Sequence, residues 1–487
     1  MKKKAKLLAL LCAAGMILSA CSPKDTPVPS GGEESRDATV DMVIVGAGAG
    51  GLSAAAEAGR QGKSAILLEK LPFTGGSSAL CEGYFWSTDA KLNEETGKGF
   101  DNETMKEALL TAAGGHAVDG LINNICDISG EIMDDITDNG AVFYKDKFTV
   151  GGGAIQGIDI FVAEGAGAGL MKSMLAIAES YDTVDIRCES EAVGLIVEDG
   201  AVKGVRVEDK EGTYNIYAAT TILATGGFLN NEEMMKEYAP DWADTTAYCG
   251  AGSTGDGHRM AMELGAHIIG SSFGCVWEFD GKNGYHMEGG MTPAVSFFRV
   301  NQEGKRVVNE YGAANVNTNN NIIVQQTGNR VYCFMDSTSM YAGLAEQSVA
   351  AGLAYKADTL EELCDQYGID KATFMETVNA YNEAKASGAD DPDFGVPNAY
   401  MVSMTEGPFY ATYYQPMPTN CLAGLECDEF CRILDQNGQP IPNLYGVGEL
   451  VIGSVVGDGN YPCCGTCLAS GIYGGPIAVR HALGIMK

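Results

Sequence analysis

The sequence has few histidines and few basic residues. Among its 487 residues there are 5 His, and 32 Lys and Arg stand against 64 Asp and Glu, for a formal net charge of -32. Binding to nucleic acid or to anionic lipid head groups by charge needs a basic surface, so this balance argues against both. The histidines show no HxxxH or HExxH spacing, and no GxSxG motif is present. These absences argue against a zinc site and a serine hydrolase.

Long apolar runs are also missing. The longest, Leu7 to Leu18, is too short to span a membrane and follows four lysines within the first six residues. The "LSAC" that ends at Cys21 resembles a bacterial lipobox, so we expect a lipoprotein signal peptide over 1–20 and a lipidated Cys21. The Pro/Ser/Gly-rich stretch 21–37 then suits a flexible tether. The chain is thus predicted to be extracytoplasmic and held to the cell membrane by its lipid anchor alone; an ordinary signal peptide with a chance cysteine is the alternative.

Cysteine is not scarce, but its spacing is irregular. Of 15 cysteines, 13 remain after Cys12 and Cys21 are set aside, an odd number that cannot all pair within one chain. Six lie late in the sequence, yet they lack the usual four-cysteine spacing of an iron–sulfur cluster. Disulfides or buried thiols are favoured over a cluster, and no CxxCH haem site is present.

The clearest motif is "DMVIVGAGAGGLSAAAEAG", which begins at Asp41. Gly46, Gly48 and Gly51 form a GxGxxG pattern between a strand-like run and a helix-like run. The three glycines permit a tight turn, close approach of a pyrophosphate and close packing of helix on strand. A second apolar run ends at Glu69, 18 residues after Gly51, where an acid binds a ribose hydroxyl. The pattern predicts dinucleotide binding, and no second such motif offers a nicotinamide site.

Further motifs follow in order: "TGGSSALCEGY", "TTILATGGFLNN", "STGDGHRMAMELGA", "NQEGKRVVNE", "IPNLYGVGEL" and "GNYPCCGTCLASGIYGG". Together they resemble the flavoprotein family of fumarate reductases and succinate dehydrogenases. The sequence is most similar to soluble single-chain members such as flavocytochrome-type fumarate reductases, urocanate reductase and 3-ketosteroid Δ1-dehydrogenase. The resemblance covers Ala38 to the C-terminus.

The resemblance implies FAD as cofactor and an α/β fold. A Rossmann-like FAD-binding domain would be formed by two chain segments, 38–235 and 402–487, with an inserted α+β capping domain at 236–401. Some relatives bind flavin covalently through a histidine near "GGSS", but residues 74–90 contain none, so FAD should be non-covalent.

The family also implies the residues that would contact FAD. Glu69 would bind the adenosine ribose and Val193 would meet adenine through its backbone. The dipole of the last helix would stabilise negative charge on the flavin. The full predicted set is Gly46, Ala47, Gly48, Gly51, Glu69, Gly76, Ser77, Ser78, Val193, Gly226, Asp256, Glu449, Thr466, Cys467 and Leu468. For Asp256 and Glu449, a capping or turn role is the alternative.

The substrate residues of fumarate reductases are replaced in this chain. Ala314 stands where the family has its proton-delivering arginine, Thr419 or Asn420 where it has a histidine, and Tyr461 where it has another arginine. A dicarboxylate substrate is therefore disfavoured. "NYPCCG" instead resembles the "YPG" of ketosteroid dehydrogenases, which implies that Tyr461 and Gly465 hydrogen-bond a substrate carbonyl; packing of Tyr461 in the core is the alternative.

The proton donor is left open among three residues, Tyr311, Arg299 and His286. Arg306 is expected to brace the capping domain through an ion pair, and His258 to be structural.

The prediction is an FAD-dependent oxidoreductase acting on CH–CH bonds. It would reduce the activated C=C bond of an enone or α,β-unsaturated carbonyl compound by hydride transfer from flavin N5. Its partners would be this small-molecule substrate and an external electron donor, with no nucleic acid. The alternatives are a ketosteroid-type dehydrogenase running the reverse reaction, and a lipoprotein that holds flavin only to bind ligand or relay electrons.

Overall fold

The computed structural model describes residues 36–150, 155, 159–270, 273–279, 282–283, 298–310, 316–457 and 461–486. The predicted signal peptide, Cys21, nearly all of the tether, and Tyr311, His286 and Ala314 lie outside the described residues. Within the described part, no helix is both long and apolar enough to cross a bilayer.

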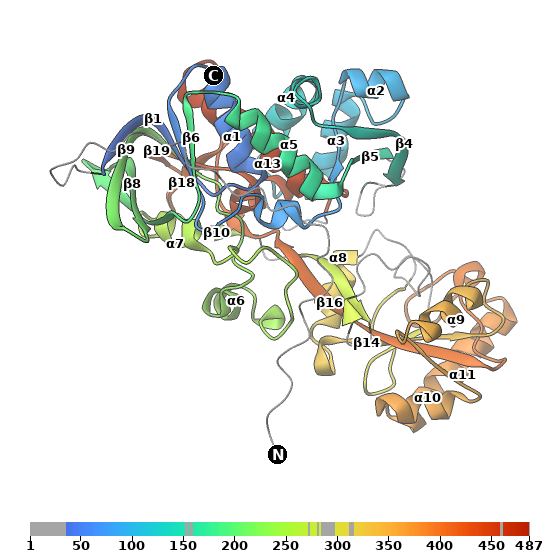
Figure 1. Cartoon of the computed structure of the whole chain (residues 1–487). Coiled ribbons are helices and arrows are strands. Elements are labelled where there is room, and N and C mark those ends of the chain that lie inside the picture. The colour runs from blue at the N-terminus through green and yellow to red at the C-terminus, as the bar shows by residue number, and fades with distance from the viewer. Residues whose placement is uncertain are drawn as a thin grey trace.

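The larger lobe is built on a sheet whose central strands are parallel (Figure 1). Its parallel strands, in spatial order, are β19 (Pro440–Gly446), β9 (Gly212–Leu223), β1 (Ala38–Val45), β2 (Ala65–Leu68) and β6 (Val184–Arg187). β2 is buried along its whole length, as expected of a parallel strand covered on both faces. β19 comes from the C-terminal part of the chain, whereas the other parallel strands come from the N-terminal half. Two distant chain segments therefore build one domain.

Other elements extend the edges of this lobe. The strands β7 (Glu191–Glu198) and β8 (Ala201–Asp209) form an antiparallel ribbon on β9, and β18 (Arg432–Leu434) pairs with β19. A small sheet contains β3 (Tyr84–Phe85), β5 (Asp159–Ala163) and β4 (Phe143–Val150). The accompanying helices are α2 (Lys91–Thr96), α3 (Asn102–Ala113), α4 (Asp119–Asp138), α5 (Ala166–Glu179), α6 (Glu232–Tyr238), α7 (Asp256–Met262) and α12 (Gly453–Val456).

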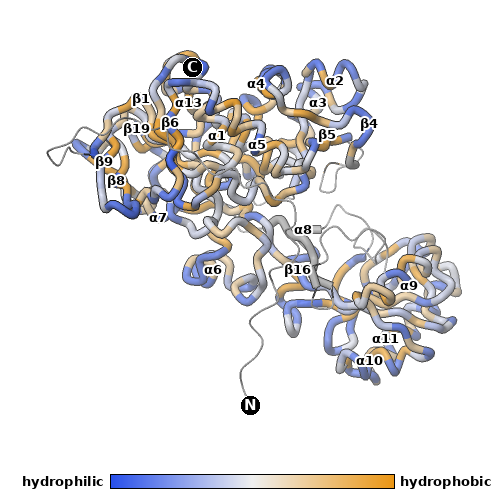
Figure 2. Tube along the Cα trace, in the orientation of Figure 1, coloured by the Kyte–Doolittle hydropathy of each residue, from blue (hydrophilic) through white to orange (hydrophobic). Residues whose placement is uncertain are grey.

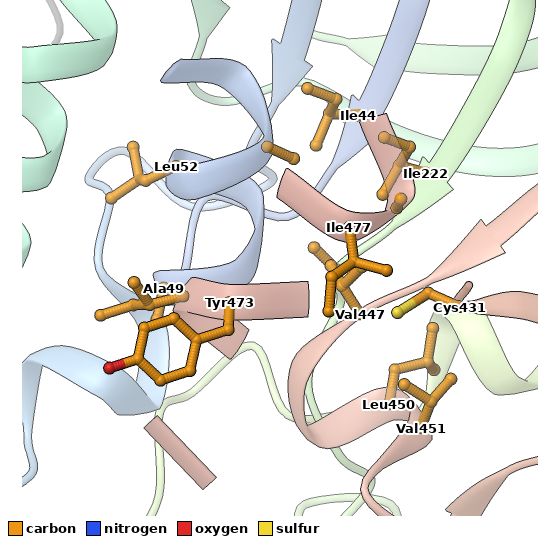
Figure 3. Packing of buried hydrophobic residues seen from close by; sticks show 14 of the residues in the cluster. Ile44, Ala49, Leu52, Ile222, Cys431, Val447, Leu450, Val451, Tyr473 and Ile477 are labelled. Carbon is orange, nitrogen blue, oxygen red and sulfur yellow. The ribbon is translucent and has the colours of Figure 1, made fainter. Parts of the chain in front are cut away.

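Helices α1 (Ala49–Arg60) and α13 (Thr466–Ala482) pack against each other beside the sheet. Their approach is close: a Cβ added at Gly475 of α13 would lie 2.6 Å from the Ala54 nitrogen of α1. In Figure 3, Ala49 of α1 lies beside Tyr473 of α13, and both belong to the buried core of the larger lobe. The small residues of α1 therefore allow this packing.

The inserted lobe, residues 273–421, has its own sheet and its own apolar clusters. Its longest strand, β16 (Phe409–Cys421), runs from this lobe back to the larger one (Figure 1). Around it lie β11 (Phe273–Phe279), β12 (Lys282–Asn283), β13 (Phe298–Val300), β14 (Val331–Asp336) and β15 (Tyr355–Ala357). The helices are α8 (Val316–Ile323), α9 (Ala342–Ala350), α10 (Leu360–Tyr367) and α11 (Lys371–Ser387). Figure 2 shows apolar residues inside both lobes and hydrophilic ones on α6, α10 and α11.

The predicted α/β fold, with a two-segment domain and an inserted α+β domain, is confirmed. Two elements nevertheless cross the predicted boundaries. Met260 and Ala261 of α7 are buried in the core of the larger lobe, although they lie beyond residue 235. β16 pairs with β11 and β14 of the inserted lobe, although it lies beyond residue 401. A short sheet of β10 (Ile268–Ile269) and β17 (Gly424–Leu425) lies where the two lobes meet.

Twelve cysteines whose side chains the structure describes form no disulfide bond with one another, and seven of them are buried. Among the described residues no group of three or more His, Cys, Asp or Glu side chains is placed to hold a metal ion.

Candidate cofactor-binding and active site

The loop between β1 and α1 uses its three glycines differently. Gly46 has a φ of +99°, and a Cβ there would lie 2.5 Å from the Ala224 carbonyl oxygen; at Gly51 it would lie 1.8 Å from the Gly46 oxygen. No other residue fits either position without a shift of the backbone. Among the residues that the structure describes, the atom nearest to a Cβ on Gly48 would be Ser78 Oγ at 3.8 Å. Gly48 therefore leaves open backbone at the start of α1, where a helix N-terminus attracts phosphate.

Glu69, at the end of β2, is tied to this loop. Its side chain is 8% exposed. Its Oε2 accepts the Ala47 N–H at 3.0 Å, and its Oε1 accepts the Leu71 N–H at 2.9 Å. Burial raises the pKa of Glu69 despite these bonds. Each carboxylate oxygen keeps a further lone pair for a ribose hydroxyl.

The "GGSS" segment folds over the glycine loop as a short 3-10 helix, Gly76–Ala79. Ser78 Oγ accepts the Ala49 N–H at 3.3 Å, and a Cβ on Gly76 would lie 3.9 Å from Gly48 Cα. Ser77 Oγ accepts the Gly250 N–H at 2.9 Å. The structure thus brings these three predicted residues together with the start of α1.

Val193 lies at a bulge of β7, between the paired residues Ala192 and Gly194. A bulge residue has no ladder partner, so its backbone is available to a ligand. Asp256, at the first position of α7, receives a hydrogen bond from Lys70 Nζ at 2.5 Å and one from Arg259 at 2.6 Å. Burial opposes the charge of Asp256, but the bond and charge of Lys70 hold its pKa below the usual value.

Glu449 lies against the glycine turn that follows β9. Its Oε1 accepts the Cys421 N–H at 2.7 Å, and its Oε2 lies 3.6 Å from where a Cβ on Gly226 would stand. Glu449 has no ion pair among the residues that the structure describes. Burial raises its pKa from 4.5 to about 7. Near neutral pH this carboxyl therefore exists in both protonation states.

The start of α13 requires a glycine. Gly465 has a φ of +86°, and a Cβ there would lie 2.6 Å from the Tyr84 carbonyl oxygen. Thr466 is buried and donates its hydroxyl to the Cys463 carbonyl at 2.9 Å. Leu468 is buried in the core of the larger lobe. The predicted residues 465–468 thus form a tightly positioned helix N-terminus.

Tyr461 contacts this helix start directly. Its hydroxyl oxygen accepts the Cys467 N–H at 3.1 Å, and burial raises its pKa well above 10. The Cys467 sulfur in turn accepts a hydrogen bond from Asn420 Nδ2 at 2.8 Å. By sequence, Thr419 or Asn420 stands only as a replacement for the histidine of the family, and no local pattern shows that the end of β16 meets α13.

Arg299 is placed away from this helix start. Its buried guanidinium donates to the Tyr414 hydroxyl at 2.8 Å, within the inserted lobe. Tyr414 precedes Asn420 by six residues on β16, which at about 3.3 Å per residue amounts to roughly 20 Å. The roles of Arg299, and of Tyr311 and His286 outside the described residues, stay predictions.

Arg306 and His258 both lie in the environments that the sequence predicts. Arg306 is buried and bonds Glu310 at 2.5 Å and also Asp391, so the ion pair expected in the inserted lobe is confirmed. His258 is buried with its ring edge-on to Phe228 at 5.3 Å between centroids, and burial lowers its pKa to about 3. This environment is that of a neutral core histidine.

The residues present fit FAD. The open backbone at Gly48, the acid at the end of β2, the bulge at Val193 and the helix start at residue 465 offer successive partners for pyrophosphate, ribose, adenine and flavin. These assignments remain predictions for each residue.

Comparison with known proteins identifies the family. A model of the FAD binding domain matches residues 41–468. Urocanate reductase from Eggerthella lenta is 30% identical over 456 residues, which cover 90% of this chain and 74% of that protein. Vinyl phenol reductase from Lactiplantibacillus plantarum is 28% identical, covering 91% of this chain and 96% of that protein.

Solved structures agree with this family. The open conformation of a flavocytochrome c3 fumarate reductase matches with a TM-score of 0.72 and 26% identity, covering 92% of this chain and 78% of that one. A 3-ketosteroid Δ1-dehydrogenase from Sterolibacterium denitrificans matches with a TM-score of 0.74, covering 92% of this chain and 99% of that one. At 19% identity, the second match bears on the fold alone.

Proposed function

Because this chain belongs to the FAD binding domain family, we propose that it is an FAD-dependent oxidoreductase that reduces the activated C=C bond of an enone or another α,β-unsaturated carbonyl compound. The resemblance to urocanate reductase and vinyl phenol reductase supports a small unsaturated substrate. When bound and reduced, FAD would supply a hydride to one carbon of the bond, and the proton for the other carbon would come from the donor left open among Tyr311, Arg299 and His286. FAD is held without a covalent link, since residues 74–90 contain no histidine.

The protein's own residues bind and orient in this proposal. Glu69 would hold the ribose, the start of α1 at Gly48 would bind the pyrophosphate, and the N-terminus of α13 would stabilise negative charge on the flavin ring. Glu449 contributes a hydrogen-bonding carboxyl beside the turn at Gly226.

The observation that carries the proposal is the position of the Tyr461 hydroxyl. Its oxygen accepts the Cys467 N–H, and its proton faces the Cys467 sulfur, a weak acceptor that a substrate carbonyl would replace. Negative charge develops on that carbonyl oxygen as the C=C bond is saturated. An O–H donor already fixed in place stabilises this charge without a reorganisation cost.

The test is reduction of a panel of alkenes by the purified protein with reduced viologen dye as electron donor. The panel contains enones, unsaturated acids and a steroid enone with its saturated partner. Oxidation of the dye by at least one enone supports the reductase. The saturated steroid is assayed separately with an oxidised dye as electron acceptor. Turnover in that assay alone would replace the reductase by the ketosteroid-type dehydrogenase, and no turnover in either assay would leave a flavin-holding binding or relay protein.

Replacement of Tyr461 by Phe tests the carrying observation. The ring is kept and the donor removed, so kcat should fall about 100-fold or more with FAD content unchanged. FAD content is read from the visible absorbance of the purified protein. Unchanged turnover in Tyr461→Phe would return this side chain to a packing role.

The cellular part of the proposal is an extracytoplasmic enzyme tethered through a lipid on Cys21, fed by an external electron donor. The basic, apolar and "LSAC" segments of residues 1–21 support it. In fractionated cells, wild-type protein should sediment with membranes and Cys21→Ala should not. Equal sedimentation of both forms would contradict the anchor.

A further inference from the structure

The end of β16 and the start of α13 are joined by hydrogen bonds among Asn420, Cys467 and Tyr461. Asn420 is the next-to-last residue of β16, and its Nδ2 donates to Cys467 Sγ at 2.8 Å. The Cys467 N–H donates to the Tyr461 hydroxyl oxygen at 3.1 Å. Asn420 Oδ1 accepts a hydrogen bond from Thr419 Oγ1 at 2.9 Å. Asn420 and Tyr461 thus flank one residue at the N-terminus of α13.

Both flanking side chains have a strong hydrogen-bond donor whose partner is the Cys467 sulfur. The Tyr461 oxygen accepts the Cys467 N–H, and the Tyr461 hydroxyl also hydrogen-bonds the Cys467 sulfur. The Asn420 amide has two N–H groups, and the structure gives them one partner, a thiol sulfur. Sulfur is a weak acceptor, so a carbonyl oxygen would be a better partner for this amide.

The charge around these donors indicates which oxygen they suit. Among the described residues, no lysine or arginine makes a hydrogen bond or ion pair with Asn420, Cys467 or Tyr461. The nearby carboxyl Glu449, which binds the N–H of the adjoining Cys421, also has no cation partner there. Burial of a carboxylate without a cation is costly, whereas a neutral carbonyl needs only hydrogen-bond donors.

We propose that Asn420 is a specificity-determining residue: its amide N–H and the Tyr461 O–H together hold the carbonyl oxygen of a neutral α,β-unsaturated ketone or ester, in preference to an unsaturated carboxylate. This inference rests on the proposed function and narrows its substrate class. Tyr461 supplies the donor at the oxygen where charge develops, and Asn420 fixes the carbonyl direction. Cys467 is a positioning residue that holds both donors through its sulfur and its N–H.

The experiment compares two substrates that share one carbon skeleton, methyl cinnamate and cinnamate. Wild-type protein, Asn420→Asp and Asn420→Ala are assayed with reduced viologen dye, and kcat and KM are determined separately. Asn379→Asp, the same substitution at an exposed position of α11, is the matched control. FAD content is measured for each variant from its visible absorbance, which separates a change at the substrate site from loss of cofactor.

Wild type should prefer the ester, and Asn420→Asp should raise the KM for the ester about tenfold or more with FAD retained. Asn420→Ala should lose most of the preference between ester and acid, while Asn379→Asp should match wild type. If Asn420→Asp and Asn420→Ala keep the wild-type KM and preference, Asn420 does not contact the substrate and the inference is overturned, although enone reduction by wild type would still support the proposed function.

A binding readout decides the case in which no alkene is reduced. The saturated ketone 4-phenylbutan-2-one is titrated into the oxidised, FAD-loaded protein, and the change in flavin absorbance is recorded. A change in wild type that Asn420→Asp abolishes supports the carbonyl site even though the proposed reaction would have failed. No change in wild type, or an equal change in both proteins, overturns the site.

Discussion

The glycine loop of the larger lobe and the interior of the inserted lobe are stabilised by different interactions. Around Gly46 and Gly51, backbone atoms approach so closely that an added Cβ would stand 2.5 and 1.8 Å from a carbonyl oxygen. In the inserted lobe, the buried charge of Arg306 is balanced by Glu310 and Asp391. The first region depends on the absence of a side chain, whereas the second depends on charged partners. The two should therefore fail independently.

The largest effect is expected from Gly51→Ala in the glycine loop. The new Cβ meets the Gly46 oxygen at 1.8 Å, so the turn must move, at a cost on the order of 4 kcal/mol or more. FAD absorbance and the unfolding midpoint should both fall. The matched control is Gly343→Ala on α9, where an added Cβ would lie more than 4 Å from every described atom outside its own helix and chain neighbours. This substitution should stabilise the protein by about 0.5–1 kcal/mol. A yellow, stable Gly51→Ala protein would contradict this account of the loop.

Arg306→Leu should disrupt the inserted lobe while sparing the glycine loop. It leaves two buried carboxylates without their cation, which costs about 3–5 kcal/mol. Hydrogen exchange should speed up across α11 and β14 but not across β1 and α1, and FAD should remain bound. Arg330→Leu, which removes a cation lying 4.2 Å from the Tyr413 ring centroid, should cost about 1 kcal/mol or less. Parallel loss of FAD in Arg306→Leu would show that the lobes are not independent.

Glu69→Ala sharpens the comparison inside the larger lobe. It removes the acceptor of the Ala47 and Leu71 N–H groups together with the proposed ribose contact. FAD affinity should fall about 100-fold, measured by titrating apoprotein with FAD. Glu198→Ala, at the exposed end of β7, serves as the control. Unchanged affinity in Glu69→Ala would mean that the ribose binds elsewhere.

Glu449→Gln should change how stability depends on pH. Because burial raises the Glu449 pKa from 4.5 to about 7, the native protein holds a proton that the unfolded chain releases. This stabilisation is complete below pH 4.5 and is lost as the pH rises through about 7. The difference is on the order of 3 kcal/mol. Melting of apoprotein across this range should show a steeper decline for wild type than for Glu449→Gln, and parallel curves would contradict the raised pKa.

More of the larger lobe than of the inserted lobe could be predicted from the sequence. The turn at Gly46, the helix α1 and the acid at Glu69 are adjacent in sequence, and residue periodicity was sufficient to predict the strand, the helix and their order. The boundary at residue 401 did not match the packing, because β16 reads locally as a strand that either lobe could accept. Its pairing with β11 and β14 is a long-range choice that local pattern does not encode.

The candidate site shows the same division. The amino-acid sequence by itself determined the FAD cradle, because a glycine that must lack a Cβ and an acid at a strand end are local requirements of one βαβ unit. Only the tertiary structure decided that Asn420, Cys467 and Tyr461 meet. The end of β16 and the start of α13 can form hydrogen bonds only after the two lobes have packed. Close contacts between distant segments depend on the packing of the whole chain, which no single stretch of residues specifies.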